Sequence, residues 1–209
     1  MLIKHITFDL DGTLIDSENL MKYSWENTTK ELEINCGFNE YKKYIGLPFK
    51  IILEKLNLQK MHAEISKKYF ESNAKNIDLL KLNSGVKEIL NFLDKHSITY
   101  SIATSKPRSN TLKILKHFNL PINFFVSSDD VKYGKPYPDS MKMIMDKFSL
   151  QATDIIYVGD MLIDLSFSTN SKVKFVHYLG NKEKKFNNNL IANYKTIDHL
   201  YDLKDFIKI

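Results

Sequence analysis

The chain opens with an apolar, β-branched run that ends in two aspartates two residues apart, followed by a glycine. Residues 6–13 read Ile-Thr-Phe-Asp-Leu-Asp-Gly-Thr. The run before Asp9 predicts a short buried strand, and Gly12 lets the chain turn sharply where that strand ends. Alternation along the strand places Asp9 and Asp11 on one side, while Gly12 leaves backbone N–H groups free to face an anion. The first strand is therefore expected to end in an oxygen-rich site.

Two crowded carboxylates also constrain what such a site can bind. Like charges held close together repel, so the pair is costly unless a cation lies among them. Mg²⁺ and other hard cations prefer oxygen ligands of this kind. Asp and Gly are also ordinary turn residues, so a solvated turn after a strand would explain the same letters. The residues that follow the other predicted strands distinguish between these two interpretations.

Composition limits the broad class of the protein and its partners. The 209 residues are 43% hydrophobic and 26% charged, which is typical of a soluble globular protein with a sizeable core. The net charge of +5 arises from lysines spread among acidic residues, and the densest patch, residues 182–185, is short. We interpret that patch as a solvated loop and expect no nucleic acid polymer and no membrane as partner. Diffuse basicity favours a small anionic molecule instead.

Cysteine content and the apolar runs indicate where the protein works. Cys36 is the only cysteine, which excludes an intrachain disulfide and a thiolate metal cluster and favours a reducing compartment. Asp9 and Asp11 interrupt the N-terminal apolar stretch before it could form the core of a signal peptide. No apolar run approaches the length of a membrane span. We therefore expect a cytoplasmic protein, either a monomer or a homodimer.

After the first strand comes a long helical block. From about Ser17 to Leu82 the sequence contains no convincing strand. Glycine, proline and asparagine separate helical patterns at 18–32, 38–45, 49–57 and 61–78.

From Ser84 onward the chain alternates between strands and helices. Strands are expected at 98–103, 124–126, 155–158 and 173–176, and helices at 85–95, 109–118 and 138–148, with a final strand–helix pair at 195–208. Such alternation predicts an α/β fold with a doubly wound, Rossmann-like parallel sheet that is covered on both faces. We therefore divide the chain into an α/β core at 1–16 and 83–209 and an inserted helical block at 17–82.

Polar residues follow several of these strands. Thr104 and Ser105 end the second strand, Asp160 ends a later one, and Lys135 lies in a loop bounded by glycine and proline. Ligands of open parallel sheets bind beyond the carboxyl ends of the strands, so these groups should share one rim with the leading aspartates. Carboxylates, a hydroxyl and a lysine suit phosphoryl transfer, in which an aspartate can act as nucleophile and a second carboxylate as acid and base.

Four motifs in this order resemble the haloacid dehalogenase superfamily, specifically its phosphoglycolate phosphatase-like branch. They are DLDGTLIDS at 9–17, ATSKP at 103–107, GKPYPD at 134–139 and VGDMLID at 158–164. The resemblance covers nearly the whole chain and implies that the helical block is a cap that closes over the substrate. It also implies Mg²⁺-dependent hydrolysis of a small phosphomonoester, such as a phosphoglycolate-like molecule, a sugar phosphate or a nucleotide, through an aspartyl-phosphate intermediate.

The resemblance further implies a role for each matching residue. Asp9 would be the nucleophile and Asp11 the general acid/base. Thr104 would hold the phosphate and Lys135 would neutralise it. Mg²⁺ would be bound by the Asp9 carboxylate, the Asp11 backbone carbonyl and Asp160. The other residues expected at the site are Gly12 and Ser105 (phosphate), Asp164 (support of the metal's water shell or of Lys135), and Gly46, Leu47 and Pro48 (substrate contacts from the cap loop).

Two other functions stay open as alternatives. The first is a phosphohexose mutase of the β-phosphoglucomutase type, which needs an extra cationic group for a second phosphate. Phe49 and Met21 stand where those mutases have an arginine and a histidine, although Lys50 could partly compensate. The second is a non-catalytic binding scaffold, which the intact set of site residues disfavours. One further departure is that Ser105 replaces the asparagine usual in this branch.

Overall fold

The core of the molecule is a parallel sheet with β1 near its centre. The computed structural model describes residues 3–180 and 194–207, so the lysine-rich patch at 182–185 lies outside the described residues. The six strands run in the order β5-β4-β1-β6-β7-β8. Their bounds are His5–Phe8 (β1), Thr99–Ala103 (β4), Phe125–Val126 (β5), Ile155–Gly159 (β6), Lys174–Tyr178 (β7) and Lys195–Ile197 (β8). Because β1 pairs with both β4 and β6, the residues after Phe8 lie in the middle of the carboxyl edge.

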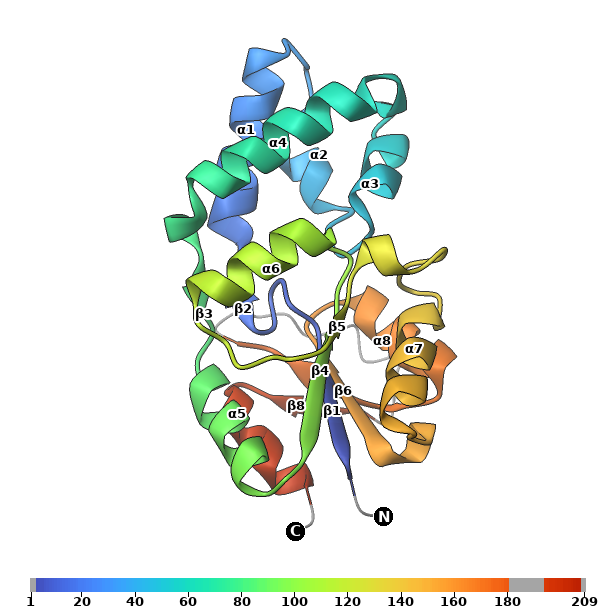
Figure 1. Cartoon of the computed structure of the whole chain (residues 1–209). Coiled ribbons are helices and arrows are strands. Elements are labelled where there is room, and N and C mark those ends of the chain that lie inside the picture. The colour runs from blue at the N-terminus through green and yellow to red at the C-terminus, as the bar shows by residue number, and fades with distance from the viewer. Residues whose placement is uncertain (1–2, 181–193, 208–209) are drawn as a thin grey trace.

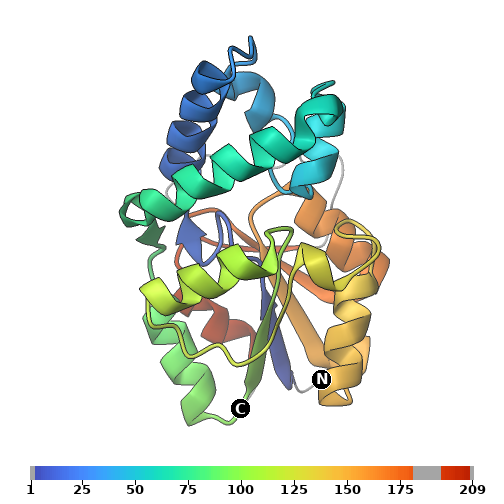
Figure 2. The ribbon, with the colours of Figure 1, turned by 45° about the horizontal axis from the view of Figure 1, so that its top comes forward.

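Helices cover both faces of this sheet (Figure 2). One face packs against α5 (Val86–Lys95), α6 (Arg108–His117) and the 3-10 helix η5 (Leu200–Phe206). The other packs against α7 (Asp139–Phe148) and α8 (Leu162–Ser171). Strand alternation sorts the side chains of β6, so that Val158 joins the first core and Tyr157 the second. The doubly wound α/β fold expected from the sequence is confirmed.

A layer of helices lies over the carboxyl edge of the sheet (Figure 1). It contains α1 (Glu18–Glu31), α2 (Phe38–Lys42), α3 (Phe49–Lys55) and α4 (His62–Lys75). This layer has its own apolar core, in which the fully buried Trp25 stacks on Tyr41 with ring centroids 4.5 Å apart. None of the described helices is long and apolar enough to cross a membrane. Short 3-10 turns lie at Gln59–Met61 (η1), Ile77–Leu79 (η2), Ser128–Asp130 (η3) and Ala152–Asp154 (η4).

The two chain segments that join the layers pair with each other. β2 (Ile15–Asp16) and β3 (Lys81–Leu82) form an antiparallel ribbon, so the expectation of no strand up to Leu82 is wrong at its end. β3 has only two residues and neither is buried, so it leaves no apolar pattern in the sequence. The Asn83 side chain also donates a hydrogen bond of 2.8 Å to the Thr13 carbonyl. The two connecting segments are thus joined to each other by hydrogen bonds where the chain passes between the sheet and the helical layer.

Candidate active site

A buried ion pair lies directly after β1. Lys135, in the loop before α7, places its Nζ 2.6 Å from Oδ1 of Asp9. Both residues are buried. Buried charges persist where they are paired and hydrogen-bonded, and here the pairing joins residues that lie far apart in the chain. The structure therefore brings together the two groups that the sequence expected as nucleophile and phosphate-neutralising cation.

Asp164 completes a network around the same lysine. Its Oδ1 accepts hydrogen bonds from Lys135 Nζ at 2.8 Å and from the Tyr157 hydroxyl at 2.7 Å. Its Oδ2 accepts the backbone N–H groups of Asp160 and Met161, at 3.2 and 3.1 Å. The Asp164 carboxylate is thus occupied on both oxygens and fixed at the start of α8.

Asp9, Asp160 and Asp164 form an acidic cluster in which one oxygen of each lies within 4.8 Å of the others. Gly12 makes this approach of chains possible, because a Cβ at Gly12 would stand 2.3 Å from Oδ2 of Asp160. The Gly12 N–H donates to the Ile15 carbonyl at 2.7 Å, and a φ of +87° favours glycine at this position as well. Crowded carboxylates of this kind suit a hard divalent cation.

The surroundings of the cluster fit such an ion. A cavity of about 90 Å³ lies beside Asp11 and Asp160, which leaves room for the waters that Mg²⁺ keeps when a protein binds it. Since both oxygens of Asp164 already accept two hydrogen bonds, Asp9 and Asp160 are the carboxylates suited to direct contact with a metal. Asp164 is suited to a supporting position.

Burial and charge oppose each other at the central pair. Burial raises the pKa of the Asp9 carboxyl well above its usual range; Lys135 lowers it, and the neighbouring Asp164 and Asp160 raise it further. Burial lowers the pKa of Lys135, but Asp164 and Asp9 outweigh that effect, so the pKa of the ammonium is raised and it stays protonated. A nucleophilic carboxylate must be ionised, so a cation among the carboxylates would favour the reactive form of Asp9.

Asp11 has one paired and one unpaired oxygen. Its Oδ2 lies 3.1 Å from Nζ of Lys106, while its buried Oδ1 has no hydrogen-bond partner among the described residues. Burial lowers the pKa of Lys106, but Asp11 outweighs this, so the pKa is raised and the lysine stays charged. The Oδ1 of Asp11 is therefore available to exchange a proton with a group that comes within hydrogen-bond reach.

Thr104 and Ser105, at the end of β4, have different partners. Thr104 is buried at the cavity, where its hydroxyl accepts the Lys106 N–H at 3.1 Å. The Ser105 hydroxyl donates a hydrogen bond of 2.6 Å to the Gly46 carbonyl. Ser105, expected at the phosphate, therefore binds the loop of the helical layer in this structure.

A partly open pocket, here named the inner cavity, lies between the sheet edge and the helical layer. It holds about 60 Å³. Its lower wall includes Asp9, Asp11, Thr104 and Lys106, and its upper wall includes Met21, Tyr41, Leu47, Phe49 and Tyr69. Gly46 and Leu47, expected as cap contacts, line this cavity, whereas Pro48 does not.

The loop at 46–48 is seated tightly on the core. A Cβ at Gly46, where φ is +99°, would lie 2.8 Å from Cγ2 of Ile163. A Cβ at Gly134 would lie 2.9 Å from Cγ of Pro48. Together with the bond from Ser105, these contacts fix the loop at three places on the rim. The helical layer is therefore closed over the site.

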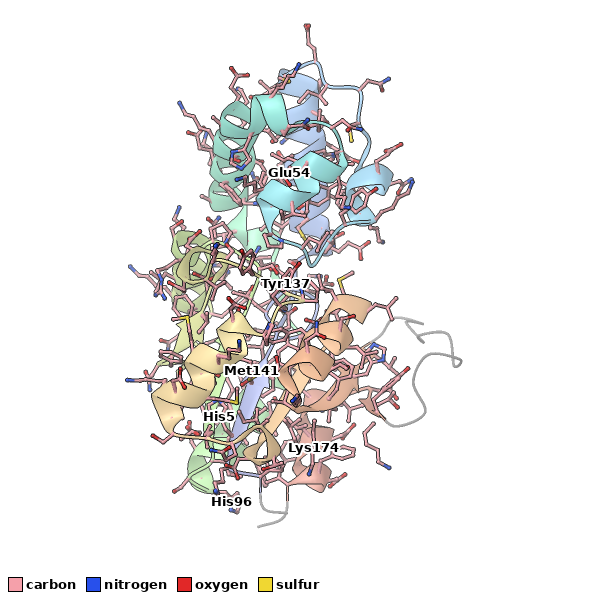
Figure 3. All side chains as sticks on the ribbon, turned by 90° about the vertical axis from the view of Figure 1, so that its right-hand side faces the viewer. His5, Glu54, His96, Tyr137, Met141 and Lys174 are labelled. Carbon is pink, nitrogen blue, oxygen red and sulfur yellow. The ribbon has the colours of Figure 1, made fainter. Side chains whose placement is uncertain are left out.

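A larger hollow, the outer groove, lies on the far side of this loop. It holds about 890 Å³ between α3 and the segment 128–137. Figure 3 shows Glu54 of α3 above Tyr137 of the core, and both residues line the groove. Lys50 and Pro48 also line it, and neither lines the inner cavity.

Two residues at the site were not assigned a role from the sequence. Lys106 stands inside a recognised motif, but only the structure pairs it with Asp11. Tyr157 lies on an apolar strand two residues before Gly159, where alternation places it on the face of α7 and α8. The sequence alone offers no signal that brings Tyr157 to Lys135, because the two residues lie 22 positions apart.

Comparison with known proteins identifies the family. The model of the family described as "Haloacid dehalogenase-like hydrolase" matches residues 6–178 of this chain. The pyrophosphatase PpaX of Oceanobacillus iheyensis is 28% identical, over 100% of this chain and 97% of that protein. The PpaX of Bacillus velezensis is 30% identical, over 81% of this chain and 80% of that protein. A crystal structure of a hydrolase from Pseudomonas syringae, 25% identical, superposes with a TM-score of 0.84 over 97% of both chains. The chain belongs to the haloacid dehalogenase-like hydrolase family.

Proposed function

We propose that the protein is a Mg²⁺-dependent phosphatase that hydrolyses small phosphomonoesters through an aspartyl-phosphate on Asp9. The observation that carries this proposal is the contact of Lys135 with Asp9 at 2.6 Å, beside Asp11 with its unpaired oxygen. A buried carboxylate held by a lysine, with a second carboxylate beside it, supplies the nucleophile, the charge neutralisation and the proton exchange that phosphoryl transfer needs.

In the first half of the proposed reaction, an Asp9 oxygen attacks the phosphorus of the ester and displaces the leaving oxygen. Asp11 in its acid form gives its proton to that oxygen, so that a neutral alcohol departs. Lys135 neutralises charge on the transferring phosphoryl group, and Thr104 offers its hydroxyl to a phosphate oxygen at the edge of the cavity.

In the second half, a water molecule attacks the phosphorus of the aspartyl-phosphate. Asp11, now a carboxylate, takes the proton of that water, and the bond from phosphorus to Asp9 breaks. Inorganic phosphate leaves, and both aspartates return to their starting forms. The sum of the two halves is the ester plus water giving the alcohol plus phosphate.

The proposed metal would be held by Asp9, Asp160 and the backbone carbonyl of Asp11, with Asp164 in support. Mg²⁺ bound there would neutralise phosphate oxygens and keep the nucleophile ionised. Asp164 holds Lys135 and the backbone at the start of α8 at the same time. We infer that it couples the position of the lysine to that of the metal ligand Asp160.

We propose that residues 17–82 act as a cap on a core formed by 1–16 and 83–209. The ribbon of β2 and β3 supports this division, because it gathers both chain crossings at one place where a hinge could act. With the helical layer in this position, the inner cavity between it and the core holds about 60 Å³ and is partly open to its surroundings.

The lining of the inner cavity supports a phosphatase over a phosphohexose mutase. Met21 and Phe49, at the positions where those mutases carry cationic groups, lie in the upper wall of the cavity. Lys50, which could have compensated, lines the outer groove instead. The cap therefore offers an apolar wall where a second sugar phosphate would need a cation.

Inorganic pyrophosphate is a second candidate substrate. Lys106 is the observation in its favour, because this lysine places a positive charge in the cavity wall, beside Asp11, the proposed donor to the leaving oxygen. A phosphate leaving group would meet that charge. The relatives named pyrophosphatase make the same substrate worth testing.

Hydrolysis of p-nitrophenyl phosphate by the purified protein tests the proposal. Turnover with Mg²⁺, its loss with EDTA and its return with added Mg²⁺ are expected. Turnover that persists without metal contradicts the mechanism, and no turnover by the metal-loaded protein favours the scaffold alternative. Ranking phosphoglycolate, pyrophosphate, sugar phosphates and nucleotides by kcat/KM then identifies the substrate class. Conversion between hexose 1- and 6-phosphates would indicate the mutase.

A further inference from the structure

The Tyr157 hydroxyl lies at the centre of the buried charge network. It accepts a hydrogen bond of 2.7 Å from Lys135 Nζ and donates one of 2.7 Å to Oδ1 of Asp164. The side chain is fully buried, and its ring packs against Phe167 and Phe175 with centroids 5.0 and 6.3 Å away. Both the position and the direction of this hydroxyl are therefore fixed by the core between the sheet and α8.

A lysine ammonium has three N–H donors, and at Lys135 each of them has an acceptor. The acceptors are Asp9 at 2.6 Å, Tyr157 at 2.7 Å and Asp164 at 2.8 Å. Once Asp9 is joined to phosphorus, its charge is lost, and the lysine must turn that donor to the phosphoryl oxygens. Tyr157 and Asp164 are then the two groups that still hold the ammonium in place.

We propose that Tyr157 is a positioning residue that holds Lys135 in reach of the phosphoryl group during transfer. This inference rests on the proposed phosphatase function. Without the hydroxyl, the lysine loses one of its two remaining anchors, and Asp164 Oδ1 loses one of its two donors but keeps Lys135. Misplacement of a neutralising group costs rate more than substrate binding, because the charge it meets is greatest in the transition state.

Tyr157→Phe tests the proposal, because it removes the hydroxyl and keeps the ring. With p-nitrophenyl phosphate, kcat should fall by about 10- to 100-fold, as expected for one hydrogen bond to a charged group. The KM should change much less, and the Mg²⁺ concentration that gives half-maximal activity should stay the same. In a Lys135→Met background, the same substitution should cost little more, because the residue that it positions is gone.

Two control variants separate this role from packing and from the general loss of a tyrosine hydroxyl. Phe175→Leu loosens the packing around the same ring but keeps the hydroxyl, so it should lower the melting temperature without the loss in kcat. Tyr100→Phe removes a hydroxyl that donates to Asp94, away from the site, and should leave kcat unchanged.

Several outcomes would overturn the inference. A kcat within about twofold of wild type in Tyr157→Phe would show that the lysine needs no such anchor. A loss of kcat matched by Phe175→Leu, or accompanied by a raised Mg²⁺ requirement, would assign Tyr157 to packing or to the metal site. A wild-type protein without turnover on any phosphate compound would instead contradict the proposed function itself.

Discussion

The hydroxyl of Ser105 donates a 2.6 Å hydrogen bond to the carbonyl of Gly46, which ties the end of β4 to the loop between α2 and α3. The bond joins the strand end that carries Thr104 to the loop that roofs the inner cavity. A cap that opens and closes must break and remake it. Ser105 therefore links the end of β4 to the position of the helical layer.

Ser105→Ala should weaken the closed form of the cap. The substitution removes one hydrogen bond, so kcat/KM for a small phosphomonoester should fall by about 2- to 10-fold. Ser109→Ala, at an exposed serine at the start of α6, is the matched control and should have no effect. Equal kinetics for wild type and Ser105→Ala would show that this bond does not contribute to closure.

Gly134→Ala should hinder closure by direct contact. The added Cβ would lie 2.9 Å from Cγ of Pro48, a ring that cannot swing aside as a long side chain can. We expect kcat/KM to fall by about tenfold, a typical penalty for overpacking, with little change in melting temperature. The double variant Gly134→Ala/Pro48→Ala should recover most of the loss. Gly37→Ala, where the nearest atom is the flexible end of Glu40, is the control.

Asp160→Asn should raise the Mg²⁺ concentration needed for activity. The amide keeps the shape of the side chain but removes the charge that a hard cation prefers. Titration of activity with Mg²⁺ should shift to at least about tenfold higher concentration, as is typical when a metal site is disturbed. Asp146→Asn, at an exposed position of α7, should leave the titration unchanged. An unaltered curve for Asp160→Asn would remove Asp160 from the metal site.

His5 should make the stability of the fold depend on pH. It is fully buried on the face of the sheet that packs against α7, where its ring lies 4.5 Å from that of Phe148, and Figure 3 shows it well below Glu54 of α3. Its ring nitrogens are hydrogen-bonded to Thr99 and Ser101. Burial lowers its pKa from 6.5 to about 4. Between these values the unfolded chain binds more protons than the folded protein, so stability falls as the pH falls from 6.5 towards 4.

Urea unfolding at pH 7.5 and pH 5 measures this effect. The linkage relation gives a loss of about 2 kcal/mol at pH 5 from this histidine alone. His5→Gln, which has no titrating ring, should lose about that much less stability between the two pH values than wild type. Parallel losses in the two proteins would mean that His5 is protonated as easily in the fold as outside it.

Much of the site was predictable because parallel strands share one carboxyl edge. Asp9, Thr104 and Asp160 each follow a strand of the sheet, so their convergence needed only the alternation of strands and helices. The helical layer was also readable, because its helices keep apolar periodicity. The helices and strands could be predicted from local sequence patterns, and the site from the rule that ligands bind at the carboxyl edge of a parallel sheet.

The contacts that remained hidden join elements remote in the chain. Tyr157 reads as an apolar strand residue until the loop of Lys135 is placed beside it. The pairing of Lys106 with Asp11, and of Ser105 with Gly46, depends on loop paths that no periodicity encodes. The ribbon of β2 and β3 is too short to leave a pattern. These contacts depend on how separate elements pack in space, which the residue types alone do not specify.

Trapping the phosphoenzyme tests the central claim, the role of Asp9 as nucleophile, most directly. Rapid acid quenching during turnover of p-nitrophenyl phosphate, followed by mass spectrometry of peptides, should find phosphate on Asp9 in the wild type. Asp9→Asn should form no phosphoenzyme and show no turnover. Asp11→Asn should turn over about 10²- to 10⁴-fold more slowly and accumulate the phosphoenzyme, because the base for its hydrolysis is missing. Phosphate on Asp11 in the wild type, or normal turnover by Asp9→Asn, would contradict the account.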